Sequence, residues 1–160
     1  MNQNNKLLSG LRIVDLSRVM SGPYCTALLA DLGAEVIKIE TPVSGDDSRH
    51  FGPFVDGQSV YFSLLNRNKK SVTLNLKDER ARQMLYALVE TADAVVENFR
   101  PGVAERLGVG YEALKARNPR LVYLSISGFG QQGEFRGRPA YDLIIQAMSG
   151  RMSTTGPPHQ

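Results

Sequence analysis

The sequence is poor in the residues that crosslink a fold or hold a metal. Its 160 residues include one cysteine, two histidines and no tryptophan. A single cysteine excludes an internal disulfide and a cysteine-rich zinc site. No apolar run approaches the ~20 residues of a membrane-spanning helix, and the polar residues 1–6 lack the apolar centre of a signal peptide. We therefore expect a cytoplasmic protein with no membrane span.

Several common ligand motifs are missing as well. No GxGxxG follows the first predicted strand, and GxxxxGK followed by Ser or Thr does not occur. The usual dinucleotide and P-loop sites are therefore excluded. His50 and His159 stand far apart and fit no metal-ligand pattern, so no metal site is predicted. Cys25 lies in a predicted helix without a neighbouring base, which indicates a small core residue rather than a nucleophile.

The charge is nearly balanced, with 19 Lys and Arg against 16 Asp and Glu and a net charge of +3. No basic stripe alternates with stacking aromatic residues, so nucleic acid is not an expected partner. The basic residues instead form short groups, which suit either solvated loops or a ligand that carries phosphate. These groups are Arg67 with Lys69 and Lys70, Arg100 with Arg106, and Arg136 with Arg138.

Short apolar runs alternate with amphipathic segments along the whole chain. Strands are predicted over residues 11–16, 35–40, 70–76, 93–97 and 121–126. Helices are predicted over 23–32, 60–66, 103–107, 111–117 and 141–151, and a further helix opens at Asp78 with an apolar face that includes Met84. Ser21 is expected to cap the first helix and Gly33 to end it, while residues 41–58 are expected to be irregular. The alternation predicts an open, mainly parallel α/β sheet with helices on both faces.

Ligands of such sheets bind beyond the carboxyl ends of the strands. Three predicted loops lie there: residues 17–22, 98–102 and 128–140. Asp142 follows the last of these loops at the start of a helix. Its carboxylate suits either the positive end of the helix dipole or a ligand site, and the residue pattern leaves both open.

Five groups of motifs, in order, resemble the family III CoA-transferases, which include the related α-methylacyl-CoA racemases. They are residues 8–16 with 21–23, residues 31–40, residues 66–71, residues 96–102, and residues 140–142 with 155–156. The resemblance implies that residues 1–160 form the N-terminal portion of a Rossmann-like large domain. It also implies that the second domain and the returning C-terminal segment are absent.

The resemblance implies a role for each matching position, with CoA or acyl-CoA as substrate and no tightly bound cofactor. CoA carries several phosphates, which call for cations and backbone N–H groups. Thr41 departs from the pattern, because formyl-CoA transferase has arginine there. The expected CoA contacts are Met20 and Ser21 along the CoA, Leu74, Asn75, Leu76 and Lys77 at the adenosine end, Asn98, Phe99 and Arg100 in the channel, Arg106 at a phosphate, and Pro139, Ala140, Tyr141 and Asp142 near the thioester.

The family's nucleophile is an aspartate that forms an aspartyl-CoA intermediate, and the resemblance places it beyond Gln160. We therefore expect an inactive N-terminal fragment of an acyl-CoA:carboxylate CoA-transferase, whose full-length form is an interlocked homodimer. A short protein that binds CoA or a partner without catalysis is an alternative. A racemase fragment is disfavoured, because the racemases have histidine where Tyr141 stands and tyrosine, with a pKa of about 10, is a poor base.

Overall fold

The computed structural model describes residues 6–156. The chain divides into two compact units, Met1–Ile126 and Ser127–Gln160, and each is described by itself. Within residues 6–156, no helix is long and apolar enough to cross a membrane. The same residues contain no group of three His, Cys, Asp or Glu side chains placed to hold a metal ion. His159 lies outside the described residues.

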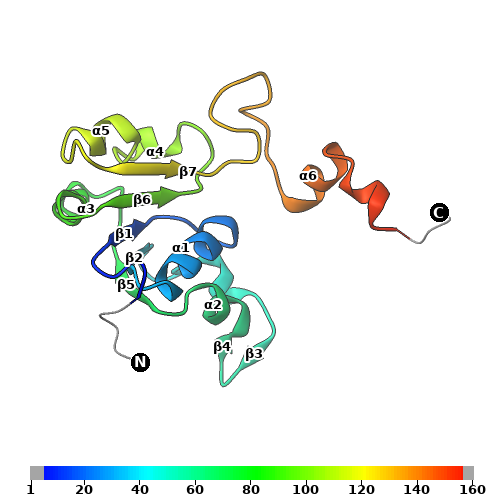
Figure 1. The fold of residues 1–160 in the computed structure, drawn as a ribbon, viewed down its shortest axis with the longest axis horizontal. Helices are drawn as coiled ribbons and strands as arrows, with labels where there is room; N and C mark the ends of the chain where they lie inside the picture. Colours follow the sequence, from blue (N-terminus) through cyan, green and yellow to red (C-terminus); the bar gives the residue numbers. More distant parts are fainter. Residues whose placement is uncertain (1–5, 157–160) are drawn as a thin grey trace. The chain divides into compact units, whose positions relative to one another are not determined.

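The first unit is built on a five-stranded sheet in which every neighbouring pair is parallel (Figure 1). Its order is β5-β2-β1-β6-β7, so the chain moves outward from β1 on one side and then on the other. The predicted parallel α/β sheet is therefore confirmed, and the direction of winding reverses between β1 and β6. The strands are β1 (Arg12–Asp15), β2 (Glu35–Glu40), β5 (Lys69–Thr73), β6 (Ala94–Glu97) and β7 (Val122–Ser125).

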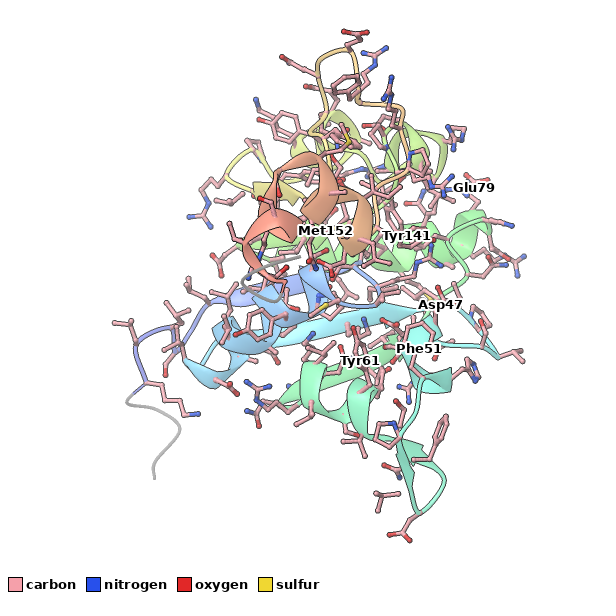
Figure 2. The ribbon with its side chains drawn as sticks, turned by 90° about the vertical axis from the view of Figure 1, so that its right-hand side faces the viewer. Asp47, Phe51, Tyr61, Glu79, Tyr141 and Met152 are labelled. Carbon is pink, nitrogen blue, oxygen red and sulfur yellow. The ribbon has the colours of Figure 1, made fainter. Side chains whose placement is uncertain are left out.

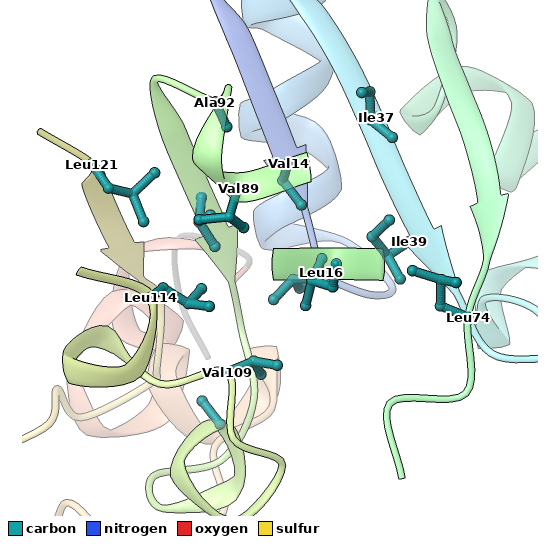
Figure 3. Packing of buried hydrophobic residues seen from close by; sticks show 13 residues of the cluster. Val14, Leu16, Ile37, Ile39, Leu74, Val89, Ala92, Val109, Leu114 and Leu121 are labelled. Atoms are coloured by element: carbon teal, nitrogen blue, oxygen red, sulfur yellow. The ribbon is translucent and has the colours of Figure 1, made fainter. Parts of the chain in front are cut away.

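Helices cover both faces of the sheet because successive strand residues point to opposite faces. Val14, Ile37 and Val95 pack in the larger core with α3 (Glu79–Glu90), α4 (Val103–Arg106) and α5 (Tyr111–Lys115). Their neighbours Ile13 and Val36 pack in a second core with Ala30 of α1 (Ser21–Asp31). Figure 3 shows the larger core, which reaches the carboxyl ends of β1 and β2.

The segment 41–58 is more ordered than we expected. It contains the short helix η2 (Asp47–His50) and an antiparallel hairpin of β3 (Phe54–Val55) and β4 (Gln58–Ser59). Asp56 and Gly57 both have positive φ, at 49° and 74°, as the tight turns of such hairpins require. The helix α2 (Val60–Leu65) follows, and Phe51 packs edge-on against Tyr61 at 5.7 Å between ring centroids (Figure 2).

Two predicted helix details are wrong. Ser21 does not cap α1 but is its first residue, with Met20 in the cap position and no side-chain cap bond. Met84 was expected on the buried face of α3, yet it is 63% exposed. The predicted start at Asp78 is confirmed, since its side chain accepts a hydrogen bond from the backbone N–H of Arg80.

The second unit contains α6 (Asp142–Met148) and the short helix η3 (Arg151–Thr154). The predicted helix over 141–151 is therefore too long, because Gly150 adopts a left-handed conformation (φ 76°) that ends α6. Asp142 is the first residue of α6, where its charge suits the helix dipole. Residues 157–160 of the predicted tail lie outside the described residues.

Gly22 packs against the end of β1 so closely that a side chain does not fit. An added Cβ would lie 2.1 Å from Cβ of Ser17, whose backbone N–H is itself bound to Asp15 at 2.9 Å. Alanine is normally the better helix former, but here we expect Gly22→Ala to lower the free energy of unfolding by about 1–3 kcal/mol. Urea unfolding measures this.

The matched control is Gly137→Ala, because an added Cβ there has no atom within 4 Å. This control is expected to change the free energy of unfolding by less than about 0.5 kcal/mol. A Gly22→Ala variant as stable as the unsubstituted protein would contradict the close approach of α1 to Ser17.

Candidate functional site

A cavity of about 330 Å³ opens in the first unit at the carboxyl ends of β1, β2, β5 and β6. This is where the winding of the sheet reverses and where open α/β sheets bind ligands. Its lining comes from residues that directly follow or end these strands and from α4 and its flank. They are Leu16, Arg18, Ile39, Glu40, Thr41, Gly45, Asp46, Leu74, Asn75, Leu76, Lys77, Phe99, Val103 and Leu107.

Buried residues of the larger core form the apolar wall of the cavity. Leu16, Ile39 and Leu74 belong to that core and also line the cavity (Figure 3). Strand β5 ends at Thr73, earlier than predicted, and the backbone N–H of Leu74 donates to the carbonyl of Glu40 at 2.9 Å. This bond keeps Leu74 beside the end of β2, and residues 74–77 line the cavity.

Positive charge at this cavity is only loosely compensated. Arg18 approaches a carboxylate only at 3.6 Å, where its Nη1 faces Asp47. Within residues 6–156, Lys77 forms no ion pair closer than 4.0 Å. The two carboxylates of the lining are each paired with another cation, Glu40 with Arg49 and Asp46 with Lys38. Arg18 and Lys77 are thus available to an anionic ligand.

Glu40 is held as a carboxylate by a dense set of donors. Nε and Nη2 of Arg49 donate to it at 2.6 and 2.7 Å, and Ser71 Oγ donates at 2.7 Å. The backbone N–H of Asp46 adds a fourth bond at 2.9 Å. Burial opposes ionisation, but these hydrogen bonds outweigh it and hold the pKa of Glu40 at about 2.

Two buried ion pairs lie behind the cavity. Lys38 Nζ contacts Asp46 Oδ2 at 2.8 Å and Lys69 Nζ contacts Asp15 Oδ2 at 3.0 Å, with all four side chains at most 2% exposed. Burial works against the charge of Asp46, but the ammonium of Lys38 lowers its pKa below the usual value. For Lys69 burial dominates and lowers the pKa in spite of Asp15. The first pair joins β2 to the loop that follows it, and the second joins β5 to the end of β1.

The backbone of Phe99, which lines the cavity, is held by the buried carboxylate of Glu97. Glu97, the last residue of β6, is 3% exposed, and its Oε2 accepts a hydrogen bond from the backbone N–H of Phe99 at 2.7 Å. Burial raises the pKa of Glu97 in spite of this bond. The bond ties the backbone of Phe99 to the end of β6, and the Phe99 side chain packs against the larger core beside the cavity.

The structure gathers only part of the predicted CoA contacts. Leu74, Asn75, Leu76, Lys77 and Phe99 all line the cavity. The lining does not include the remaining predicted contacts. Of these, Met20, Ser21, Asn98, Arg100 and Arg106 belong to the first unit, whereas Pro139, Ala140, Tyr141 and Asp142 belong to the second, separately described unit.

Arg18 lines the cavity but is not among the CoA contacts expected from the sequence. The sequence predicts that the loop 17–22 faces a ligand, and within that loop it indicates Met20 and Ser21 rather than Arg18. Nothing local distinguishes Arg18 from a solvated arginine. Its position is the available signal: Arg18 lies three residues after the end of β1, and β1 is one of the two strands between which the winding reverses.

Known proteins resemble the chain over most of its length. CoA-transferase family III matches residues 8–160. Acetyl-CoA:oxalate CoA-transferase of Acetobacter aceti is 56% identical over 149 residues, which cover 93% of this chain and 38% of that protein. Succinyl-CoA:glutarate CoA-transferase of Mus musculus is 49% identical over 153 residues, covering 95% and 35%.

The fold of the chain also resembles that of solved structures. The crystal structure of a CAIB/BAIF family protein from Brucella suis matches with a TM-score of 0.92 and 45% identity, over 98% of this chain and 42% of that one. The chain spans 38% and 35% of the two curated relatives named above. The motifs, the parallel sheet and the match over residues 8–160 lead to one conclusion: the chain belongs to CoA-transferase family III.

Proposed function

We propose that the chain binds CoA in the cavity at the carboxyl ends of β1, β2, β5 and β6, and that it is the N-terminal portion of the large domain of an acyl-CoA:carboxylate CoA-transferase. The observation that carries the CoA site is the combination of apolar walls with Arg18 and Lys77 in one cavity. Apolar walls suit a base or a pantetheine arm, and two available cations suit phosphates.

The transfer step belongs to the same proposal. Relatives of the chain are named as CoA-transferases for oxalate and glutarate. The family resemblance implies attack of an aspartate on the acyl-CoA thioester, with an aspartyl-CoA intermediate, and places that aspartate after Gln160. It also implies an interlocked homodimer. Turnover is therefore to be measured on the whole enzyme, with oxalate and glutarate as the first carboxylate substrates. CoA binding is to be measured on the chain itself.

Isothermal titration with CoA tests the site, and Arg18→Ala is the informative variant. We expect the unsubstituted chain to bind CoA and Arg18→Ala to bind it at least about tenfold more weakly, because a charge-assisted contact to phosphate is worth roughly 1.5–3 kcal/mol. The loss should shrink as the salt concentration rises, since screening weakens the contact.

Arg120→Ala is the matched control, because exposed Arg120 precedes β7 at the opposite end of the sheet. It removes the same charge and is expected to leave CoA affinity unchanged within about twofold. An absence of heat at millimolar CoA, with a folded chain, would exclude the proposed site. Equal losses of CoA affinity in Arg18→Ala and Arg120→Ala would show that the affinity depends only on the overall charge of the chain.

A further inference from the structure

The turn between β1 and α1 contains a residue, directly after Arg18, whose backbone conformation needs support. Val19, the next residue, has φ 67°. A β-branched side chain is strongly disfavoured in this left-handed region. Such a residue persists only where its surroundings hold it, and held strain of this kind gathers at ligand sites. The contacts of the turn show what holds it.

Asn98 holds the turn from the β6 side. Its Oδ1 accepts the backbone N–H of Arg18 at 2.8 Å, and its Nδ2 donates to the carbonyl of Arg18 at 2.7 Å. Nδ2 also donates to Ser21 Oγ at 3.2 Å. Both amide hydrogens are used, so Asn98 keeps no side-chain donor for a phosphate. The sequence resemblance implies that Asn98 lines the CoA channel; in the structure its amide group is bound to the backbone of Arg18 and to Ser21 Oγ.

Asp46 holds the turn from the β2 side. Its two carboxylate oxygens lie 3.1 and 3.3 Å from the backbone nitrogen of Val19, and Lys38 contacts the same carboxylate at 2.8 Å. The backbone of Arg18 and Val19 is thus bound by side chains that follow two different strands. The Arg18 guanidinium stands 5.9 Å from the ring centroid of Phe99, beside the cavity.

We propose that Asn98 is a positioning residue that acts on the ligand through Arg18. β6 is the strand paired with β1 across the point where the winding reverses, and Asn98 is the residue directly after it. Its amide therefore connects the segment after β6 to the segment after β1, and both segments contribute to the cavity. This inference rests on the proposed function, because it takes CoA phosphate to be the anion that Arg18 meets.

A double-mutant cycle on CoA affinity separates positioning from general destabilisation. The variants are Asn98→Ala, Arg18→Ala and the combination of both, measured by titration with CoA. We expect Asn98→Ala to weaken CoA binding about tenfold and the double variant to bind within about twofold of Arg18→Ala, because one effect acts through the other. Losses that multiply would overturn the inference.

Asn118→Ala is the matched control. Asn118 also fixes backbone through three bonds, donating to the carbonyls of Val89 and Ala92 and accepting from Arg120, but it lies outside the cavity lining. We expect this variant to reduce stability and leave CoA affinity unchanged within about twofold. A loss of affinity equal to that of Asn98→Ala would overturn the inference.

Amide hydrogen exchange, read by NMR without CoA, gives a second measurement. In Asn98→Ala the amides of Arg18 and Val19 should exchange at least about tenfold faster, while Asn118→Ala leaves them protected. Unchanged protection of Arg18 in Asn98→Ala would overturn the inference. If the unsubstituted chain binds no CoA, the proposed function fails, and the exchange result alone then decides whether Asn98 holds the turn.

Discussion

Lys38→Met is expected to lower the free energy of unfolding at pH 8 by about 3–5 kcal/mol, because it leaves a buried carboxylate without its counter-ion. Lys38 is 1% exposed and contacts Asp46 at 2.8 Å and the carbonyl of Ser17 at 2.8 Å. Methionine retains most of the side-chain volume but supplies neither the charge nor the donors. Urea unfolding at pH 8 measures the loss.

The loss should depend on pH in a direction that identifies Asp46. In the unsubstituted protein the ammonium of Lys38 holds the pKa of Asp46 below its usual value despite burial. Without Lys38, burial raises that pKa above the unfolded value of about 3.9. Protonation then relieves the buried charge, so the loss should be largest at pH 8 and should shrink as the pH falls toward 5.

Lys70→Met is the matched control for this experiment. Lys70 lies next to Lys69 on β5 and pairs with Glu35, but its side chain is 70% exposed. A solvated pair of this kind contributes at most about 1 kcal/mol. A Lys38→Met loss as small as the Lys70→Met loss would contradict the burial of the pair. A loss that is equal at pH 5 and pH 8 would exclude Asp46 as its origin.

Acid is expected to remove about 2–3 kcal/mol of stability through Glu40 alone. Its pKa is held at about 2, below the usual value of 4.5, because bonds from Arg49, Ser71 and the Asp46 N–H outweigh burial. A depressed carboxyl pKa stabilises the folded state fully above the unfolded pKa. This contribution should disappear as the pH falls from about 4.5 to about 2.

Arg49→Met tests the assignment of this acid-sensitive stability to Glu40. It removes the two bonds at 2.6 and 2.7 Å, while methionine can still cover the Phe62 ring, which the guanidinium now approaches at 3.7 Å. The pKa of Glu40 should rise, so the variant should lose less stability than the unsubstituted protein between pH 4.5 and pH 2. Urea unfolding over this range measures both slopes.

Arg67→Met supplies the comparison, because Arg67 pairs with Asp31 on the surface, where its side chain is 40% exposed. This variant should keep nearly the slope of the unsubstituted protein, since a solvated pair contributes little. If Arg49→Met kept that slope as well, Glu40 would not be the group whose protonation matters.

The strands and helices that were predicted correctly are those whose signals lie within a few residues of one another. The apolar run of β2 ends at Glu40, and the helix that opens at Asp78 shows both a cap and an apolar face. Each of these signals depends on residues a few positions apart. The same reasoning failed for Met84 and for the hairpin at Asp56 and Gly57, because contacts with distant residues decide which side of a helix is covered and whether a loop folds back.

The amino-acid sequence alone predicts the five strands of the parallel sheet, the helices between them and the resemblance to CoA-transferase family III. It also pointed to the loops beyond the strand ends as the ligand side. The packing of distant segments is what brings Arg18 to the cavity, binds Asn98 to the backbone of Arg18 and buries Lys38 against Asp46. Arg18 and Asn98 are 80 residues apart, so their contact depends on which strands become neighbours, and no local pattern records that pairing.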